Sequence, residues 1–414
     1  MSRRALLLGG AGAVVLAATP GTAGQRNARV RVPTRVGTWS AAVTAQAPKL
    51  VYSLTGQTVR QVVHTSVGGD RPQVRFSNAF GTTPVRVGAA SLGLRGGTGP
   101  STATVPGTLQ KLTFAGRPDA VIPAGGTLLS DAAPLIVPPG ADLVISLYLP
   151  EKTEVGTLTP RAYQANVVAD GDVTGQDDPG GEPFATYLFL TGVSVRARRS
   201  TSAIVAFGDS ITRGAQTVES ANHRWPDLLA ARLRAGDADR AVLNAGISGN
   251  RLLAGPFGRT GRAGSNAWSG EAGVRRFDRD VLAQPGVSHV IVLIGVNDFG
   301  TASKAGTGAL IAGHRQLIAR GKDAGLTMIG GTLLPFGGYR ATFDTPETRA
   351  KREAFNSWVR TSGEYDGFVD FDAAVRDPDA PYRMRAAFDS GDHLHPNDAG
   401  MAALANAVPL ELFE

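Results

Sequence analysis

Three residues of the chain have the types and spacing needed for nucleophilic chemistry. The segment Ala203–Gly214 ends an apolar run with Gly-Asp-Ser, which places Ser210 where a buried strand should give way to a loop and a helix. A serine hydroxyl is a poor nucleophile at neutral pH and needs a base, usually a histidine that a carboxylate holds in one tautomer. Asp392 and His395, in the segment DHLHP near the C-terminus, fit that pair. The residues predict acyl transfer through Ser210.

Acyl transfer also needs hydrogen-bond donors for the oxyanion that forms on the substrate carbonyl. Losing one such donor typically lowers the rate by roughly 10²–10³-fold. Two segments between the serine and the histidine supply candidates: Asn244–Asn250 (NAGISGN) contains Gly249, and Gly295–Asp298 (GVND) contains Asn297. We expect the backbone N–H groups of Ser210 and Gly249 and the side-chain amide of Asn297 to form this oxyanion hole. A glycine lets the backbone approach the substrate closely, and an asparagine amide adds a donor.

The order of these segments along the chain resembles that of the SGNH, or GDSL-type, hydrolases. Ser210, Gly249, Asn297 and His395 stand in the order of the family's four sequence blocks, and the resemblance covers about half of the chain, from Ser202 to Glu414. The resemblance implies a flavodoxin-like α/β fold. It also implies hydrolysis of carboxylic esters through an acyl-enzyme intermediate on the serine.

Part of the pattern resembles a subgroup of this family that is found beside polysaccharide-degrading enzymes. That likeness rests on Asn244–Asn250, on GDSITRG and on the helical stretch Arg276–Pro285. It implies an acylated small molecule or polysaccharide as substrate, and our leading expectation is a secreted esterase for short acyl groups, O-acetyl above all, on carbohydrate. A lipase, lysophospholipase or arylesterase is the alternative among enzymes. A non-catalytic glycan-binding protein is the alternative from another class.

The composition of one loop supports a short acyl group. Leu252–Ser269 is rich in Gly and Arg, with Phe257 and Trp268 as isolated aromatic residues. This composition suits contact with a sugar face better than the enclosure of a long alkyl chain. The same two aromatic residues could instead simply pack the loop.

The candidate site residues also have simpler interpretations. Asn297 and Asp298 could serve turn chemistry and a helix N-cap. Asp392, His393 and His395 could be metal ligands, but neither an HExxH motif nor a cysteine accompanies them, so we expect no metal and no cofactor. Packing or surface roles are expected for the remaining histidines, which are His64, His223, His289 and His314.

Length and composition bound the class of protein. A chain of 414 residues is long for one domain, so two are expected, and 42% hydrophobic residues suffice for real cores. The net charge of +7 comes mainly from Arg that is spread through the whole sequence, with no basic run, which argues against nucleic acid as a partner. The Arg content could favour anionic polymers or could equally reflect genomic composition. Nothing in the sequence indicates an oligomeric state.

The first 29 residues have the pattern of an export signal. Arg3 and Arg4 precede an apolar run that ends near Ala18, and small residues that a signal peptidase could accept follow at Gly21–Ala23. The arginine pair resembles a twin-arginine motif, and an ordinary general-secretory signal is the alternative. The apolar run, at roughly 14 residues, is shorter than the ~20 that a membrane span needs, so we expect a secreted protein without a stable membrane anchor.

The rest of the chain divides into two patterns. Residues 30–199 alternate with period two and are interrupted by Gly, Pro, Asn and Asp clusters, which predicts an all-β sandwich or jelly roll that acts as an accessory domain. The expected strands include Val59–Val62, Gln73–Phe76, Val85–Val87, Asp142–Leu149, Tyr187–Leu190 and Val193–Val195, followed by an exposed junction at Arg196–Ser200.

Residues 200–414, by contrast, alternate uniformly apolar strands with helices, which predicts a parallel sheet with helices on both faces. We expect this part to be the SGNH hydrolase catalytic domain. Its candidate residues should lie at the carboxyl ends of the strands, where such sheets bind ligands. The expected strands are Ala203–Phe207, Ala241–Leu243, Val287–Ile294, Leu326–Gly330 and Phe368–Phe371. The expected helices are Trp225–Arg234, Gly273–Leu282, Gly308–Asp323, Glu347–Ser362 and Asn397–Leu404.

Overall fold

The computed structural model describes residues 34–46, 52–97, 99–256, 267–300 and 305–414. The predicted signal peptide over residues 1–29 lies outside the described residues, as does Phe257. Residues 33–414 form one compact unit, and the predicted domain boundary at 199/200 stays a prediction. Within the described ranges, no helix has both the length and the apolar character that crossing a membrane requires.

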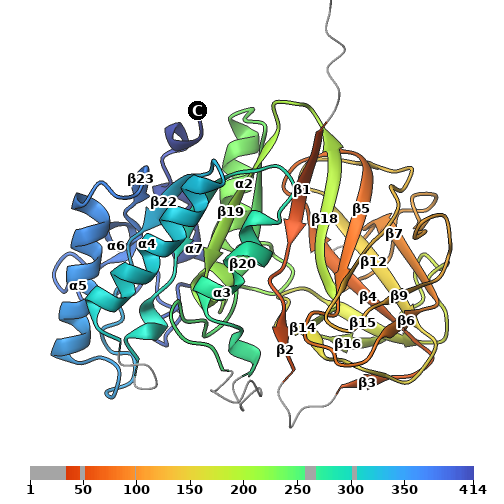
Figure 1. Cartoon of the computed structure of the whole chain (residues 1–414), viewed down its shortest axis with the longest axis horizontal. Coiled ribbons are helices and arrows are strands. Elements are labelled where there is room, and N and C mark those ends of the chain that lie inside the picture. Colours follow the sequence, from red (N-terminus) through yellow and green to blue (C-terminus); the bar gives the residue numbers. More distant parts are fainter. Residues whose placement is uncertain (1–33, 47–51, 98, 257–266, 301–304) are drawn as a thin grey trace, which may run out of the picture. The chain divides into compact units, whose positions relative to one another are not determined.

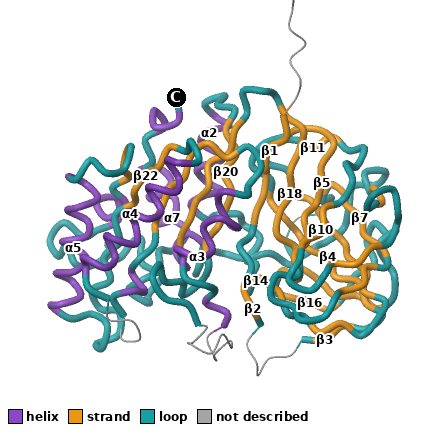
Figure 2. The backbone as a smooth tube through the Cα atoms, viewed as in Figure 1, coloured by secondary structure: helices purple, strands orange, loops and turns teal. Residues whose placement is uncertain are grey.

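Strands β1 to β18 occupy residues 34–197 (Figure 2). Every strand pair found among the described residues of this region is antiparallel. The first large sheet has the order β1-β18-β5-β10, with β11 also on β5; its strands are β1 (Thr34–Ser40), β18 (Leu190–Ala197), β5 (Gly69–Ser77), β10 (Thr127–Leu129) and β11 (Ile136–Val137). The second has the order β16-β15-β4-β12-β7-β8; its strands are β16 (Glu182–Phe184), β15 (Asn166–Asp170), β4 (Gln57–His64), β12 (Asp142–Leu149), β7 (Ala89–Leu94) and β8 (Gln110–Lys111). Smaller pairings join β13 (Thr153–Glu154) to β3 (Ser53–Leu54), β6 (Val85–Val87) to β9 (Ala120–Ile122), and β14 (Thr157–Thr159) to both β17 (Tyr187–Leu188) and β2 (Thr44–Ala45).

The alternation in the sequence becomes the burial pattern of these strands. In β5, Val74 and Phe76 are buried whereas Gln73 and Arg75 are partly exposed, as expected when successive side chains point to opposite faces. The end of the region differs from expectation. The stretch Tyr187–Leu190 breaks into β17 and β18 because Phe189 adopts a left-handed conformation with φ of 59°.

The predicted exposed junction Arg196–Ser200 also needs correction, because its first two residues belong to a strand. Strand β18 continues through Arg196 to Ala197, and the Arg196 guanidinium donates to the Asp70 carboxylate on β5, with Nε at 2.6 Å. The ion pair therefore holds the end of β18 against its neighbour, and only residues 198–201 connect the strand to the following sheet.

The remaining strands form one parallel sheet of order β20-β19-β21-β22-β23. In chain order this is 2-1-3-4-5, the order of flavodoxin-like sheets, which bind ligands where the strand order reverses. The strands are β19 (Ser202–Gly208), β20 (Arg240–Gly246), β21 (Val287–Leu293), β22 (Thr327–Gly331) and β23 (Gly367–Val369). Because both faces are covered, the strands are almost uniformly apolar, and residues 203–208 of β19 are all buried.

Helices cover this sheet on both sides (Figure 1). Helix α2 packs against α7, whereas α4 packs against α3 and α5, as expected when right-handed crossovers put the two groups on opposite faces. The helices are α1 (Ser210–Arg213), α2 (Trp225–Ala235), α3 (Gly273–Phe277), α4 (Thr307–Asp323), α5 (Pro346–Thr361), α6 (Phe371–Val375) and α7 (Asp398–Ala407), with shorter turns at η1 (Ala267–Ser269), η2 (Asp278–Leu282), η3 (Val296–Asp298) and η4 (Leu410–Phe413).

Two expected elements of this part need correction. The predicted strand Phe368–Phe371 ends at Val369, because the Asp370 side chain accepts the Ala373 N–H and so caps α6. The predicted helix Gly273–Leu282 is α-helical only to Phe277 and continues as the π-helical turn η2. The other predicted strands and helices of this part are present, with ends shifted by a few residues.

Candidate active site

Ser210 lies at the carboxyl end of β19, as the first residue of α1. The Asp209 side chain accepts the Ile211 N–H at 3.0 Å and thereby caps this short helix, and Gly214 ends it with φ of 95°. Gly208 allows the sharp turn before the serine, because a Cβ atom there would lie 2.1 Å from Thr212 Oγ1. The local sequence thus fixes the serine at the edge of the sheet.

The structure brings Ser210, His395 and Asp392 together. His395 Nε2 lies 2.8 Å from Ser210 Oγ, and His395 Nδ1 lies 2.6 Å from Asp392 Oδ2. The other Asp392 oxygen, Oδ1, accepts the backbone N–H groups of Leu394 at 2.9 Å and His395 at 2.8 Å. The carboxylate therefore holds both the backbone and the imidazole of the loop that carries His395. This is the arrangement in which an imidazole can accept the serine proton.

The Asp392 carboxylate is held in its ionised form. Burial would raise the pKa of Asp392, but hydrogen bonds from the His395 side chain and backbone, together with the charge of His395 and the Leu394 N–H, hold the pKa well below its usual range. Gln216, which follows α1, also donates to Asp392 Oδ2 at 3.4 Å. An ionised carboxylate at this place stabilises the imidazolium that forms when His395 takes a proton.

His393 points to a different carboxylate. Its Nδ1 lies 2.7 Å from Asp389 Oδ2, its backbone has φ of 65°, and it is half exposed. Within the described residues, no group of three or more His, Cys, Asp or Glu side chains could hold a metal ion. A metal site in this loop would need His393 together with Asp392 and His395. The geometry instead pairs His393 with Asp389.

Gly249 lies in a tight turn beside Trp268. It has φ of 70°, and a Cβ atom at this position would lie 3.1 Å from Trp268 Cζ3. Both the backbone conformation and the lack of space favour glycine here. The described residues contain no protein acceptor for the backbone N–H of either Ser210 or Gly249. These two donors are therefore available to an oxyanion.

Asn297 lies beside the same turn. Its Nδ2 donates to the Asn250 carbonyl at 3.0 Å, which leaves the second N–H of the amide for another acceptor. Its neighbour Asp298 is buried and accepts the backbone N–H groups of Leu252 at 2.7 Å and Leu253 at 3.0 Å. Asp298 thus fixes the loop that follows Gly249 and caps no helix through its side chain.

Two buried carboxyl groups near the serine have raised pKa values. Burial raises the pKa of Asp209 to about 7, and the Asp298 charge adds to this effect, while the Ile211 N–H and the charges of His395 and Arg276 oppose it. Burial likewise raises the pKa of Asp298 to about 6, against the hydrogen bonds from Leu253 and Leu252. The surroundings of Ser210 therefore disfavour negative charge on these two groups.

The remaining histidines lie away from this constellation. His64 and His223 each pair with a carboxylate, Asp142 at 2.7 Å and Asp398 at 2.6 Å. His289 packs edge-on against Phe413, and the buried His314 contacts the Tyr365 hydroxyl at 2.6 Å. Burial lowers the pKa of His314 to about 3, so this side chain is neutral in the core.

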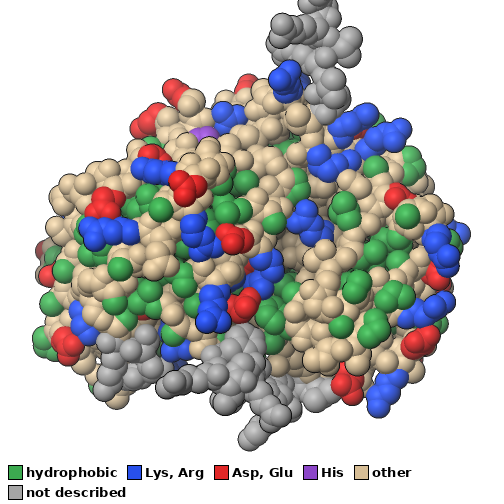
Figure 3. All heavy atoms as spheres, viewed as in Figure 1, with side chains coloured by type: hydrophobic (Ala, Val, Ile, Leu, Met, Phe, Trp, Pro, Cys, Tyr) green, Lys and Arg blue, Asp and Glu red, His purple; other side chains and the backbone are tan. Residues whose placement is uncertain are grey.

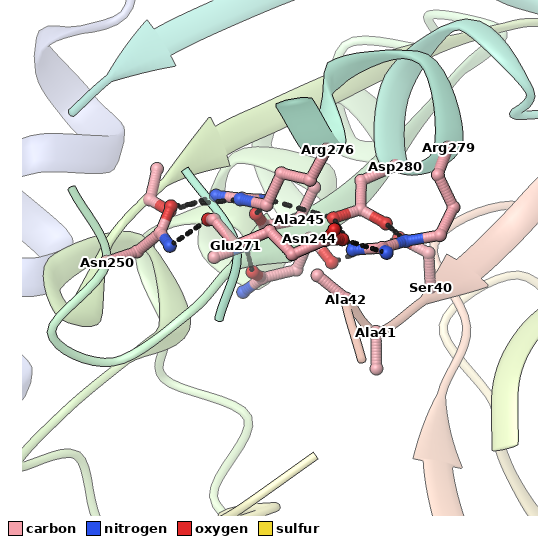
Figure 4. A network of polar contacts seen from close by, with 12 residues as sticks. Ser40, Ala41, Ala42, Asn244, Ala245, Asn250, Glu271, Arg276, Arg279 and Asp280 are labelled. Carbon is pink, nitrogen blue, oxygen red and sulfur yellow. Dashed lines mark hydrogen bonds and ion pairs between the residues drawn. The ribbon is translucent and has the colours of Figure 1, made fainter. Parts of the chain in front are cut away.

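Sequence reasoning assigned no role to Asn250 and Arg276. Asn250 accepts the Asn297 amide through its backbone carbonyl, and Arg276 donates to the Asn250 side chain. Asn250 ends the segment NAGISGN, so its closeness to Gly249 was a usable signal. Arg276 is one of many arginines on a helical stretch, and no local pattern distinguishes it. Figure 4 shows how these two side chains point toward one another. On the face shown in Figure 3, Lys and Arg side chains are interspersed with Asp and Glu.

The C-terminal part of the chain is similar to a known family and to solved structures. The model of the GDSL-like lipase/acylhydrolase family matches residues 206–403. A carbohydrate acetylesterase from Sinorhizobium meliloti is 16% identical, with 50% of this chain and 96% of that chain covered and a TM-score of 0.38. A lipase/acylhydrolase from Enterococcus faecalis is 22% identical, with 50% and 93% covered and a TM-score of 0.38. A GDSL-like lipase from Bacteroides thetaiotaomicron is 14% identical, with 51% and 87% covered and a TM-score of 0.38. No curated protein matches this chain in sequence.

Proposed function

Since residues 206–403 belong to the GDSL-like lipase/acylhydrolase family, and the chain is thus an ester hydrolase, we propose that it cleaves short-chain acyl esters, O-acetyl above all, through an acyl-Ser210 intermediate. The observation that carries this proposal is the contact of 2.8 Å between His395 Nε2 and Ser210 Oγ, with Asp392 behind the imidazole at 2.6 Å. A serine paired in this way can act as a nucleophile at neutral pH.

The proposed reaction has two steps. In the first, Ser210 Oγ attacks the ester carbonyl carbon, His395 Nε2 takes the hydroxyl proton, and the ester C–O bond breaks as that proton passes to the leaving alcohol. In the second, a water molecule gives its proton to His395 and attacks the acyl carbon. The bond to Oγ then breaks, Ser210 regains its proton, and the carboxylic acid leaves.

The Ser210 and Gly249 N–H groups and the free N–H of the Asn297 amide are proposed to stabilise the oxyanion of both steps. Such donors help because they are held in place before charge develops, so no reorganisation is needed during the reaction. The absence of protein acceptors for the two backbone N–H groups in the described residues supports this assignment.

An acylated carbohydrate is the proposed natural substrate. Trp268 supports this, because it is 41% exposed and its ring lies against Gly249, where it can offer a flat apolar surface beside the reacting ester. Aromatic rings of this kind suit one face of a sugar.

The β-rich part and the N-terminus complete the proposal. We propose that residues 30–199 form a β-sandwich accessory domain, supported by the two antiparallel sheets of this region. Export is proposed on the strength of Arg3, Arg4 and the following apolar run. Replacing both arginines with Lys should block secretion if the twin-arginine route is used, since a receptor reads that pair. Unimpaired secretion would instead indicate the general pathway.

Hydrolysis of p-nitrophenyl esters tests the activity. The wild-type chain should hydrolyse the acetyl ester, and Ser210→Ala should abolish this while the exposed control Ser357→Ala retains it. Rates along an acetyl, butyryl and octanoyl series should fall with chain length, and acetate should be released from acetylated xylan. A series that peaks at octanoyl, with no acetate released, would move the assignment to lipid esters. Full activity in Ser210→Ala would overturn the proposed nucleophile.

A further inference from the structure

Arg276 is a fully buried cation whose donors are almost all in use. Its side chain has 0% exposure and lies at the end of α3, just before the π-helical turn η2. Burial lowers the pKa of Arg276 to about 10, against the nearby Asp280, so the guanidinium stays charged at neutral pH. Burying a charge is costly unless it is paired and hydrogen-bonded. The contacts around Arg276 supply that compensation.

Two of these contacts join the ends of neighbouring strands. Nη2 donates to the Gly208 carbonyl at 2.7 Å, and Nη1 donates to the Ala245 carbonyl at 2.8 Å. Gly208 ends β19 two residues before Ser210, and Ala245 lies near the end of β20, four residues before Gly249. The guanidinium thus fixes the nucleophile's strand and the oxyanion loop's strand to one rigid planar group.

A third contact continues into the oxyanion hole. Arg276 Nε donates to Asn250 Oδ1 at 2.9 Å, and the Asn250 amide donates to the carbonyls of Ser269 at 2.7 Å and Glu271 at 2.8 Å. The backbone carbonyl of Asn250 accepts Asn297 Nδ2. A continuous chain of hydrogen bonds therefore runs from Arg276 through Asn250 to Asn297.

The guanidinium itself is held on two further sides (Figure 4). Asp280 Oδ2 accepts Nη1 at 3.1 Å, and Asp280 Oδ1 accepts Arg279 Nε at 2.8 Å. Arg279 in turn donates to Glu271 Oε2 at 2.5 Å. Because the Glu271 carbonyl also accepts the Asn250 amide, these contacts form a closed ring. The Phe207 ring lies under the guanidinium, 4.0 Å from its central carbon. Arg276 therefore has a single well-defined position.

We propose that Arg276 is a positioning residue which, through Asn250, holds the oxyanion donors at Gly249 and Asn297 in place relative to Ser210. The inference rests on the proposed function of these donors. It assigns Arg276 no contact with substrate; instead the arginine determines where the second N–H of Asn297 and the N–H of Gly249 point. Preorganised donors work only when their placement is accurate, and a misplacement of about 1 Å costs about 10²-fold in rate.

A double-mutant cycle on the esterase tests this coupling. Arg276→Met should lower kcat for p-nitrophenyl acetate by about 10- to 100-fold with KM nearly unchanged, since only transition-state binding is lost. Asn297→Ala alone should lower kcat by about 10²–10³-fold. The double variant should lose less than the product of the two single losses, because one of the two donors that Arg276 positions is already gone. The pH at which activity is half-maximal should not move in Arg276→Met, since the contacts of His395 are untouched.

A matched control is Arg352→Met. Arg352 is equally buried on α5 and pairs with Asp372, and in the described residues it contacts none of Ser210, His395 and Asn297. It should lower the melting temperature and leave kcat unchanged. Where Arg276→Met does not fold, Asn250→Ser carries the same cycle, since it cuts the link without removing a charge.

Several outcomes would overturn the inference. One is an Arg276→Met enzyme with wild-type kcat, and another is a double variant whose loss equals the product of the single losses. A third is an Arg352→Met enzyme that loses kcat as Arg276→Met does. Failure of the proposed function looks different, because then the wild-type chain itself would hydrolyse no ester or Ser210→Ala would remain active.

Discussion

His395 Nε2 lies 2.8 Å from Ser210 Oγ, although 185 residues separate the two along the chain. The parallel sheet makes this possible. Ser210 follows strand β19, which lies between β20 and β21, and the loop that carries His395 leads directly into α7, which packs beside α2. Any loss of this contact should remove the base from the nucleophile without disturbing the sheet.

The two histidines of the loop provide a matched test of this contact. His395→Ala should lower kcat as severely as Ser210→Ala, leaving only the residual rate that the oxyanion donors and substrate binding supply. His393→Ala should retain nearly full kcat, because its side chain contacts Asp389 instead. Both are measured with p-nitrophenyl acetate. An essential His393 and a dispensable His395 would reverse the assignment.

Asp392 and Asp389 offer a second matched pair, since each accepts backbone N–H groups and each contacts one histidine. Asp392→Asn should lower kcat by up to about 10⁴-fold, but less than His395→Ala, because an amide cannot stabilise the imidazolium. Asp389→Asn should change kcat little. Equal losses in the two variants would show that the loop's shape, and not the Asp392 charge, supports activity.

Gly249→Ala should damage catalysis through geometry alone. The left-handed conformation costs an L-residue about 1–2 kcal/mol, and the new methyl group would meet Trp268 at 3.1 Å, so the Gly249 N–H must move. We expect kcat to fall by about 10- to 100-fold. Gly325→Ala is the control, since Gly325 has φ of 75° with nothing within 4 Å, and it should lose a similar amount of stability at unchanged kcat.

Chelators should leave the esterase activity unchanged. Deprotonation of Ser210 by His395 requires no metal-bound water, and His393, which a metal site at Asp392 and His395 would need, is paired with Asp389. The measurement is p-nitrophenyl acetate hydrolysis before and after dialysis against EDTA. Activity that is lost in EDTA and restored by zinc would favour the metal interpretation of this loop.

The sequence indicated these candidate reacting groups because each lies beside a short, local signal. Ser210 follows an apolar strand, Gly249 lies in a turn with a backbone conformation that favours glycine, and Asn297 follows another buried strand. The topology of a parallel sheet then brings such strand ends to one edge. The residue types thus predict the chemistry, and the fold predicts that the groups lie together.

The supporting contacts could not be predicted in the same way. Arg276 reaches Gly208 and Ala245 only because α3 packs over the ends of two strands that are distant in sequence. A buried arginine has no periodic signature among the other arginines of the chain. The end of the strand at Val369 was likewise set by the Asp370 cap, a contact of one side chain that apolar periodicity does not report.

The buried carboxyl of Asp209 predicts how stability depends on pH. Burial raises its pKa in the folded state from 3.8 to about 7, so the folded state binds this proton more tightly than the unfolded state. The resulting stabilisation is fully present below about pH 4 and is lost as the pH rises to about 7. Asp298 acts in the same direction, whereas Asp392, with its lowered pKa, acts in the opposite direction and only at lower pH.

Asp209→Asn should therefore reduce the fall in melting temperature between about pH 5 and about pH 8 by several degrees. The exposed Asp379→Asn should leave this fall unchanged, and a wild-type-like fall in Asp209→Asn would contradict the raised pKa.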